Sequence, residues 1–342
     1  MTHLRSTVQP ALDPVTGVKN ARIYLSTTYP IVSAFEFEFL KGEAVIRERL
    51  AGSTVYMIVQ RPLTYFANVE LGHGVLRFDI VDDVALPLRC EVRPSDIGLC
   101  SPDDDLNVEV QFFNATPGTT QPFQDVAAIK LYRTDGTFLV WWSPQKFLFE
   151  LLVNGLEAGV SGDPADFLDY RVHYIGKAFS QKVWNRLTGH EKMQRILTVE
   201  GAVGSSRAAR APFEISLIML TVVGFDDIPE FPHIGITDRP GVPPIPHVVN
   251  LDDHAAVERF MFEGLIPLKD EAMTREAEAF LIQQFRPQHN ETLFENYPNI
   301  AGGMRSKGYG WTDFVIERLP ASLRTDHYQM EKILFEAEKD AD

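Results

Sequence analysis

Long hydrophobic runs are absent from this sequence. Its most apolar stretch, Ile215 to Phe225, is too short to cross a bilayer as a helix, and no run reaches eighteen apolar residues. The opening residues, Met1-Thr-His-Leu-Arg-Ser-Thr, lack the apolar core and the small-residue cleavage site of a secretory signal. We therefore expect no membrane segment and a cytoplasmic protein.

Cysteine is scarce as well. Only Cys90 and Cys100 occur among the 342 residues. Their spacing permits a pair, but in a reducing compartment we expect two free thiols. We therefore do not expect a fold that depends on disulfides, and we assign neither cysteine a function.

Basic residues are outnumbered, with 32 Lys and Arg against 47 Asp and Glu, for a net charge of -15. A protein coated with basic surface is excluded, because each phosphate contact needs a local cation. The segment from Arg171 to Arg210 is the exception, with eight basic and two acidic residues and a net charge of +6. Such an island can direct a polyanion to one face of an acidic protein, although a charge-mixed pair of solvated helices gives the same pattern.

The composition predicts a folded α+β protein of two domains. A chain of 342 residues with 45% hydrophobic content is too long and too apolar to be disordered. From Ala21 to about Val140, short apolar or alternating runs are separated by turn residues, a pattern typical of antiparallel strands. We assign residues 1–136 to an N-terminal antiparallel β domain of unknown role, which is a candidate site for a protein partner.

The second half alternates helices and strands. Thr137 to Trp142 is expected to be a strand, and Ser143 with Pro144 predicts the start of a helix that runs to Val153. Further elements are expected as a strand at about 170–175, a helix after Ser180, a second short helix at about 191–197, an apolar strand at 214–224 and a helix at about 270–285 ended by Pro287. Six prolines between Asp226 and His247 mark a long loop or lid.

Three motifs follow one another in this half: Tyr174-Ile-Gly-Lys-Ala, then Arg186-Leu-Thr-Gly-His190, then Glu278-Ala-Phe-Leu-Ile with Phe285-Arg-Pro-Gln-His-Asn290. Their order resembles the GIY-YIG nuclease family. The resemblance covers residues 137–300, with a proline-rich insert at 226–269, and leaves 301–342 as a C-terminal strand and an acidic tail. It implies a small antiparallel sheet flanked by helices.

The resemblance implies a role for four side chains. Tyr174 would lie at the end of the second strand beside the scissile phosphate, Arg186 would face that phosphate, and Glu278 would hold Mg²⁺ or Mn²⁺. Asn290 corresponds to the terminal asparagine of the family. These residue types suit the reaction, because phosphodiester hydrolysis needs positive charge at the phosphoryl oxygens and an activated water. One glutamate is enough for the ion, because Mg²⁺ needs only one or two carboxylates.

Other side chains of the basic island fit the same function. His190 lies four residues after Arg186 and so shares its helical face, from which it can bind phosphate or shuttle a proton. Nucleic-acid contacts are expected from Lys177, Lys182, Lys192, Arg195 and Asn290. The expected substrate is nucleic acid, with DNA ahead of RNA.

The sequence departs from the family in one respect. The first motif, GIY, belongs on the preceding strand about ten residues before Tyr174, where this chain has Ser161-Gly-Asp-Pro. Either Phe138 to Trp142 is the first strand, followed by an inserted helix, or the hairpin has been rebuilt. Tyr174, Tyr170, His173 and a metal-bound water all remain candidates for the general base.

Two functions therefore stay open for this half. One is a metal-dependent endonuclease, and the other is a catalytically inactive nucleic-acid-binding or protein-interaction module that retains the same scaffold. Each motif residue also has an ordinary structural explanation: a strand tyrosine, a surface cation or an acid on a solvated helix.

Overall fold

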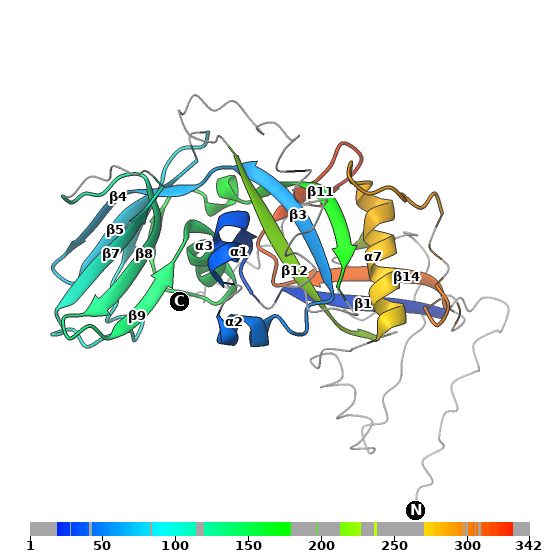
Figure 1. The fold of residues 1–342 in the computed structure, drawn as a ribbon, viewed down its shortest axis with the longest axis horizontal. Coiled ribbons are helices and arrows are strands. Elements are labelled where there is room, and N and C mark those ends of the chain that lie inside the picture. Colours follow the sequence, from blue (N-terminus) through cyan, green and yellow to red (C-terminus); the bar gives the residue numbers. More distant parts are fainter. Residues whose placement is uncertain are drawn as a thin grey trace, which may run out of the picture.

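The computed structural model describes residues 19–27, 29–40, 43–82, 84–113, 120–178, 196, 213–226, 236–237, 270–296, 298, 300–304, 306 and 309–330. In these ranges the chain forms two β-sheets with a few helices, which agrees with the expected α+β class. The two sheets lie side by side, with α1 and α3 between them (Figure 1). No helix in the described ranges is both long and apolar enough to cross a membrane.

The larger sheet draws its strands from both ends and the middle of the chain. Its strand order is β13-β14-β1-β12-β3-β11-β15-β16, with β2 added beside β12. Only the pairs β1–β14 and β11–β15 are parallel. The strands are β1 (Lys19–Thr27), β2 (Val32–Ser33), β3 (Val55–Pro62), β11 (Asp169–Lys177), β12 (Phe213–Asp226), β13 (Ile236–Thr237), β14 (Tyr309–Glu317), β15 (Ser322–Arg324) and β16 (Gln329–Met330).

The smaller sheet is antiparallel and comes from one continuous stretch of the chain. Its order is β10-β6-β5-β4-β8-β7, with β9 also paired to β8. His73 and Gly74 both have positive φ, which suits the tight hairpin between β4 and β5. The strands are β4 (Tyr65–Gly72), β5 (Val75–Val81), β6 (Leu88–Val92), β7 (Leu106–Phe112), β8 (Val126–Arg133), β9 (Phe138–Trp142) and β10 (Gly159–Ser161).

The helices begin and end where their capping residues dictate. Ser143 Oγ accepts a hydrogen bond from the Lys146 N–H at the start of α3, and Asp270 caps α7 in the same way. α7 ends at Arg286, which has a left-handed backbone, just before Pro287. The helical elements are α1 (Ala34–Leu40), α2 (Ala44–Arg49), α3 (Pro144–Val153), the 3₁₀ turn η1 (Pro164–Phe167) and α7 (Glu271–Phe285).

β3 lies between β11 and β12 and is buried on both faces. Val55, Met57 and Val59 join the core beneath α7, whereas Tyr56 and Ile58 join the core on the opposite face. This division follows from the two-residue period of a strand. α7 therefore covers one face of the larger sheet, as Figure 1 shows.

The structure corrects the expected domain boundaries. Residues 19–62 do not belong with the N-terminal β domain, because they supply β1, β2 and β3 to the larger sheet. The smaller sheet instead spans residues 65–161 and is inserted between β3 and β11. The C-terminal strand is not separate either, since β14 pairs with β1. Local patterns cannot reveal these pairings, which join residues far apart in the sequence.

The two cysteines are free thiols, as expected. Cys90 is buried in β6 and Cys100 is half-buried in the following loop. Burial raises the pKa of Cys90 to about 12, which makes it an unreactive core residue.

Candidate functional site

β11 carries the motif Tyr174-Ile-Gly-Lys, and its antiparallel partner is β3. Ile175 lies opposite Met57, and Gly176 lies opposite Tyr56. β9 pairs with β8 in the other sheet, so Phe138 to Trp142 is not the partner strand that one of the two alternatives proposed. The strand beside this motif is therefore β3, more than a hundred residues earlier in the chain.

Two tyrosine rings lie over Gly176. The ring centroids of Tyr56 and Tyr174 are 6.0 Å apart. A Cβ atom placed on Gly176 would stand 2.7 Å from Tyr174 Cε1 and 2.7 Å from the Tyr56 hydroxyl oxygen. Position 176 thus needs a glycine because the two rings occupy the space of a side chain.

Gly176→Ala is expected to destabilise the protein by about 1–3 kcal/mol, because the added methyl must displace both rings. Urea unfolding would measure this loss. Gly159→Ala is the matched control, since a Cβ on this strand glycine meets nothing closer than 3.6 Å. Equal losses in the two variants would contradict the proposed packing.

Lys177 and Glu278 form an ion pair at the end of β11. Lys177 Nζ contacts Glu278 Oε2 although the residues are 101 positions apart. The Glu278 side chain is 14% exposed and that of Lys177 is 41% exposed, so the carboxylate is largely enclosed and the ammonium faces solvent. The fold therefore brings the strand motif and the helix motif into direct contact.

Asn290 completes the edge of β11. Its Oδ1 accepts from the Ile175 N–H at 3.0 Å, and its Nδ2 donates to the Ile175 carbonyl at 2.8 Å. The His289 N–H also donates to the His173 carbonyl. Because β15 pairs only with residues 169–171, Asn290 satisfies backbone groups that would otherwise lie on an open edge. Asn290 thus holds the backbone of the motif in place, with both amide atoms bonded to Ile175.

Among the expected side chains that the structure describes, Tyr174 and Glu278 do not face the same side of β11. Tyr174 packs with Tyr56 on one face of β11, whereas Ile175 belongs to the core on the α7 face. Lys177, two residues after Ile175, meets Glu278 of α7 on that second face. The tyrosine pair and the ion pair thus lie on opposite faces at the same end of the strand, next to Gly176.

Two of the candidate bases are buried inside the fold. Tyr170 is 1% exposed beneath the Arg61 guanidinium, and burial raises its pKa far above the usual range. His173 is also buried, with Nε2 at 3.0 Å from the Gln60 amide oxygen. Because neither can reach a polymeric substrate, neither suits a general base.

Several expected residues lie outside the described part of the chain. These are Lys182, Arg186, His190, Lys192 and Arg195. Most of the proline-rich insert at 226–269 lies outside it too, apart from β13. Within the described ranges, no group of three or more His, Cys, Asp or Glu side chains is arranged to hold a metal ion.

Tyr56, which the sequence did not single out, is the residue that packs beside Tyr174. The only signal available was an aromatic residue in the apolar run Val55-Tyr56-Met57. The inserted smaller sheet separates the two tyrosines in the sequence.

Comparisons with models of known protein families, with curated proteins and with solved structures each found no match to this chain.

Proposed function

We propose that the chain is a metal-dependent endonuclease of the GIY-YIG type, with its site at the end of β11. One observation carries the proposal: the segments Val55–Met57, Tyr174–Lys177 and Glu278–Asn290, which are distant in sequence, meet at residues 175–177 of β11. They would contribute to one site at this end of the strand from both of its faces.

The strand order supports the same proposal. In the resembled family the first motif lies on the strand that precedes the Tyr174 strand. β3 precedes β11 among the strands of the larger sheet and pairs with it, which supports Tyr56 as the counterpart of the first-motif tyrosine. The ten-residue spacing is absent because the smaller sheet is inserted between the two strands.

Several side chains have a part in phosphodiester cleavage. Tyr174, which is only partly buried, orients or activates the attacking water, and Lys177 neutralises charge on the phosphate. Tyr56 is fully buried, so it packs beside the Tyr174 ring and does not contact the substrate. Arg186 and His190 are assigned from the sequence alone, to the transition-state charge and to phosphate binding or proton transfer.

Glu278 fits a Mg²⁺ or Mn²⁺ site in part. An ion of this kind keeps most of its waters and needs one or two carboxylates, and the largely enclosed Glu278 carboxylate supplies one. Lys177 contacts one oxygen of that carboxylate, so the ammonium and the ion would have to share the group. When bound, the ion would polarise the phosphoryl oxygens and lower the pKa of a coordinated water.

A plasmid-nicking assay tests the proposal. The full chain is expected to nick supercoiled DNA in the presence of Mg²⁺ or Mn²⁺ and to lose this activity when EDTA removes the ion. Single-stranded DNA and RNA would be assayed in parallel. Absence of cleavage on all three substrates with either ion would overturn the proposal.

A second candidate is a module that binds nucleic acid or protein without cutting. The ion pair between Glu278 and Lys177 favours it, because it neutralises the proposed metal ligand, and the tyrosines lie on the other face. Salt-sensitive binding of DNA without cleavage would distinguish this candidate from the nuclease. Under either function, the inserted smaller sheet is a candidate surface for a protein partner.

A further inference from the structure

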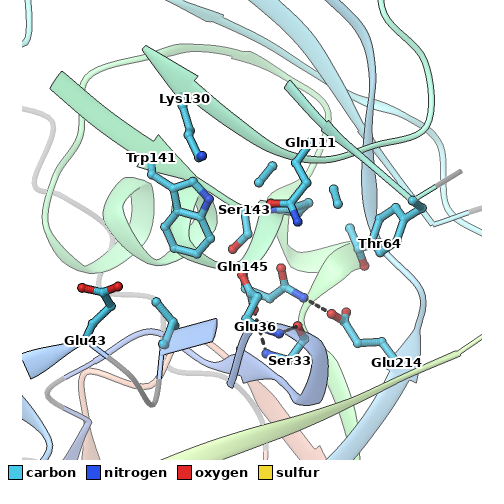
Figure 2. Close-up of a pocket in the computed structure, with 15 residues that line it drawn as sticks. Ser33, Glu36, Glu43, Thr64, Gln111, Lys130, Trp141, Ser143, Gln145 and Glu214 are labelled. Carbon is cyan, nitrogen blue, oxygen red and sulfur yellow. Dashed lines mark hydrogen bonds between the residues drawn. The ribbon is translucent and has the colours of Figure 1, made fainter. Parts of the chain in front are cut away.

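A cavity of about 270 Å³ lies where the two sheets meet, away from β11 and α7. Figure 2 shows side chains from both sides converging on it. β7, β8 and β9 form one wall, and α1, the start of α3 and β12 form the other. The lining residues are Ser33, Glu36, Leu40, Glu43, Thr64, Gln111, Phe113, Ala127, Ala128, Lys130, Trp141, Ser143, Pro144, Gln145 and Glu214.

Hydrogen bonds fix the polar groups on one side of the cavity. Glu36 Oε2 accepts from the Ser33 N–H at 2.7 Å, and Ser33 Oγ accepts from the Glu36 N–H at 3.1 Å, which forms a reciprocal cap on α1. Gln145 Nε2 donates to Glu214 Oε1, and Arg61 Nε donates to Glu214 Oε2 at 3.1 Å. These groups are held in place before any ligand arrives, which lowers the ordering cost of binding.

The remaining walls are apolar and partly flat. The Trp141 ring lies at the left side of the space in Figure 2, and Phe113, Leu40 and Pro144 also line it. An aromatic wall opposite a fixed polar base suits a planar ring with a hydrogen-bonding edge. The volume is at the small end for ligand pockets, which favours one ring system over a polymer.

The charge of the lining selects among such rings. Lys130 is already paired with Glu109, and Glu214 is paired with Arg61. The lining residues thus offer no unpaired cation to a phosphate, and Glu36 and Glu43 have no ion-pair partner among the described residues. Burial raises the pKa of Glu36 and favours its neutral form, although hydrogen bonds from Ser143 and Ser33 oppose the rise. Burial also raises the pKa of Glu214 to about 7. A carboxyl oxygen accepts from an N–H donor in either form, whereas a phosphate needs a cation.

We propose that this cavity binds an uncharged, amino-bearing heterocycle of the nucleoside class, with its ring against Trp141 and its amino edge on Glu36 and Gln145. The ligand carries no phosphate. The proposal does not rest on the nuclease function, because no residue of the cavity belongs to the site at the end of β11.

Calorimetric titration of the full chain tests this proposal. Adenosine, cytidine and guanosine are the probes, and saturable binding of at least one to a single site is expected. The corresponding monophosphate is expected to bind at least about tenfold more weakly, because the lining residues offer its charge no unpaired cation. Trp141→Leu and Glu36→Gln are each expected to raise Kd about tenfold, through loss of stacking and loss of one accepting carboxyl oxygen.

Two control substitutions outside the cavity test whether the effects on Kd are specific. Phe138→Leu and Glu157→Gln change an exposed aromatic and an exposed carboxylate outside the cavity, and each is expected to leave Kd within about twofold. Glu36 also caps α1, so circular dichroism of the variants is needed, and Trp141→Leu decides alone if Glu36→Gln fails to fold. No binding of any nucleoside, binding unchanged by Trp141→Leu, or binding only of a simple amine such as agmatine would each overturn the proposal.

Discussion

Glu278→Gln is expected to lower Mg²⁺-dependent nicking by roughly 100- to 1,000-fold, the usual effect of removing one group that stabilises the transition-state charge. Glutamine has nearly the same size and can still accept a hydrogen bond from Lys177, so α7 should pack as before. The substitution removes only the negative charge that a divalent ion requires. Single-turnover nicking rates on a supercoiled plasmid would measure the effect.

Glu271→Gln is the matched control for this experiment. Glu271 lies in the first turn of the same helix, is exposed, and pairs only with Arg275 one turn later. Glu271→Gln is expected to change the nicking rate less than about twofold, because Glu271 is not a proposed metal ligand. Its exposed ion pair also contributes little to stability, so the helix should stay folded. If wild type and Glu278→Gln cleave at the same rate, Glu278 does not bind the ion and the proposed mechanism fails.

The helices α3 and α7 could be predicted from sequence because their signals are local. Ser143 with Pro144, and Asp270 with Pro287, mark starts and stops that act over a few residues. The strand bearing Tyr174 was also placed correctly from its apolar pattern. Each of these depends on neighbours in the chain and on no distant partner.

The pairing of the strands could not be predicted in the same way. β3 was assigned to an N-terminal domain, because the residues Val55 to Val59 do not show which strands pair with it. Its unbroken burial is the physical signature of a central strand, but a short apolar run fits a sandwich core equally well. The insertion of residues 65–161 then separated Tyr56 from Tyr174 and concealed the tyrosine pair.

The cavity between the sheets could not be predicted from the sequence either, because distant segments of the chain line it. Its acidic groups come from α1 and β12, and its aromatic wall comes from β9. Glu214 opens an apolar strand and Arg61 closes another, so the only local sign was a charged residue beside buried neighbours. A charged residue in this position indicates a buried partner of opposite charge, but the sequence does not show which residue that partner is.

Arg61 and Glu214 form a buried ion pair at the junction of the two sheets. Their side chains are 2% and 7% exposed, and Arg61 Nη1 also donates to the Phe167 carbonyl at 2.6 Å. Burial lowers the pKa of Arg61, but Tyr170 and Glu214 raise it by more than burial lowers it. The guanidinium therefore stays charged. The pair therefore connects β3 and β12 of the larger sheet to η1 at the return from the smaller one.

Arg61→Met is expected to lower the free energy of unfolding by about 3–5 kcal/mol, because it leaves the Glu214 carboxylate buried without its cation. Urea unfolding would measure the loss at a pH well above 7, because Glu214 has a pKa of about 7 beside Arg61 and loss of the guanidinium raises that pKa further. Arg77→Met is the control, since Arg77 is 47% exposed in its ion pair with Glu91. That exposed pair is expected to contribute at most about 1 kcal/mol.

The double variant Arg61→Met with Glu214→Met separates the two possible origins of that loss. If the uncompensated charge is responsible, removing both charges should restore at least half of the lost free energy, because a buried pair can be replaced by apolar groups of similar size. If packing and the bond to Phe167 are responsible, the double variant should be no more stable than Arg61→Met. A loss no larger in Arg61→Met than in Arg77→Met would show that the junction does not depend on this pair.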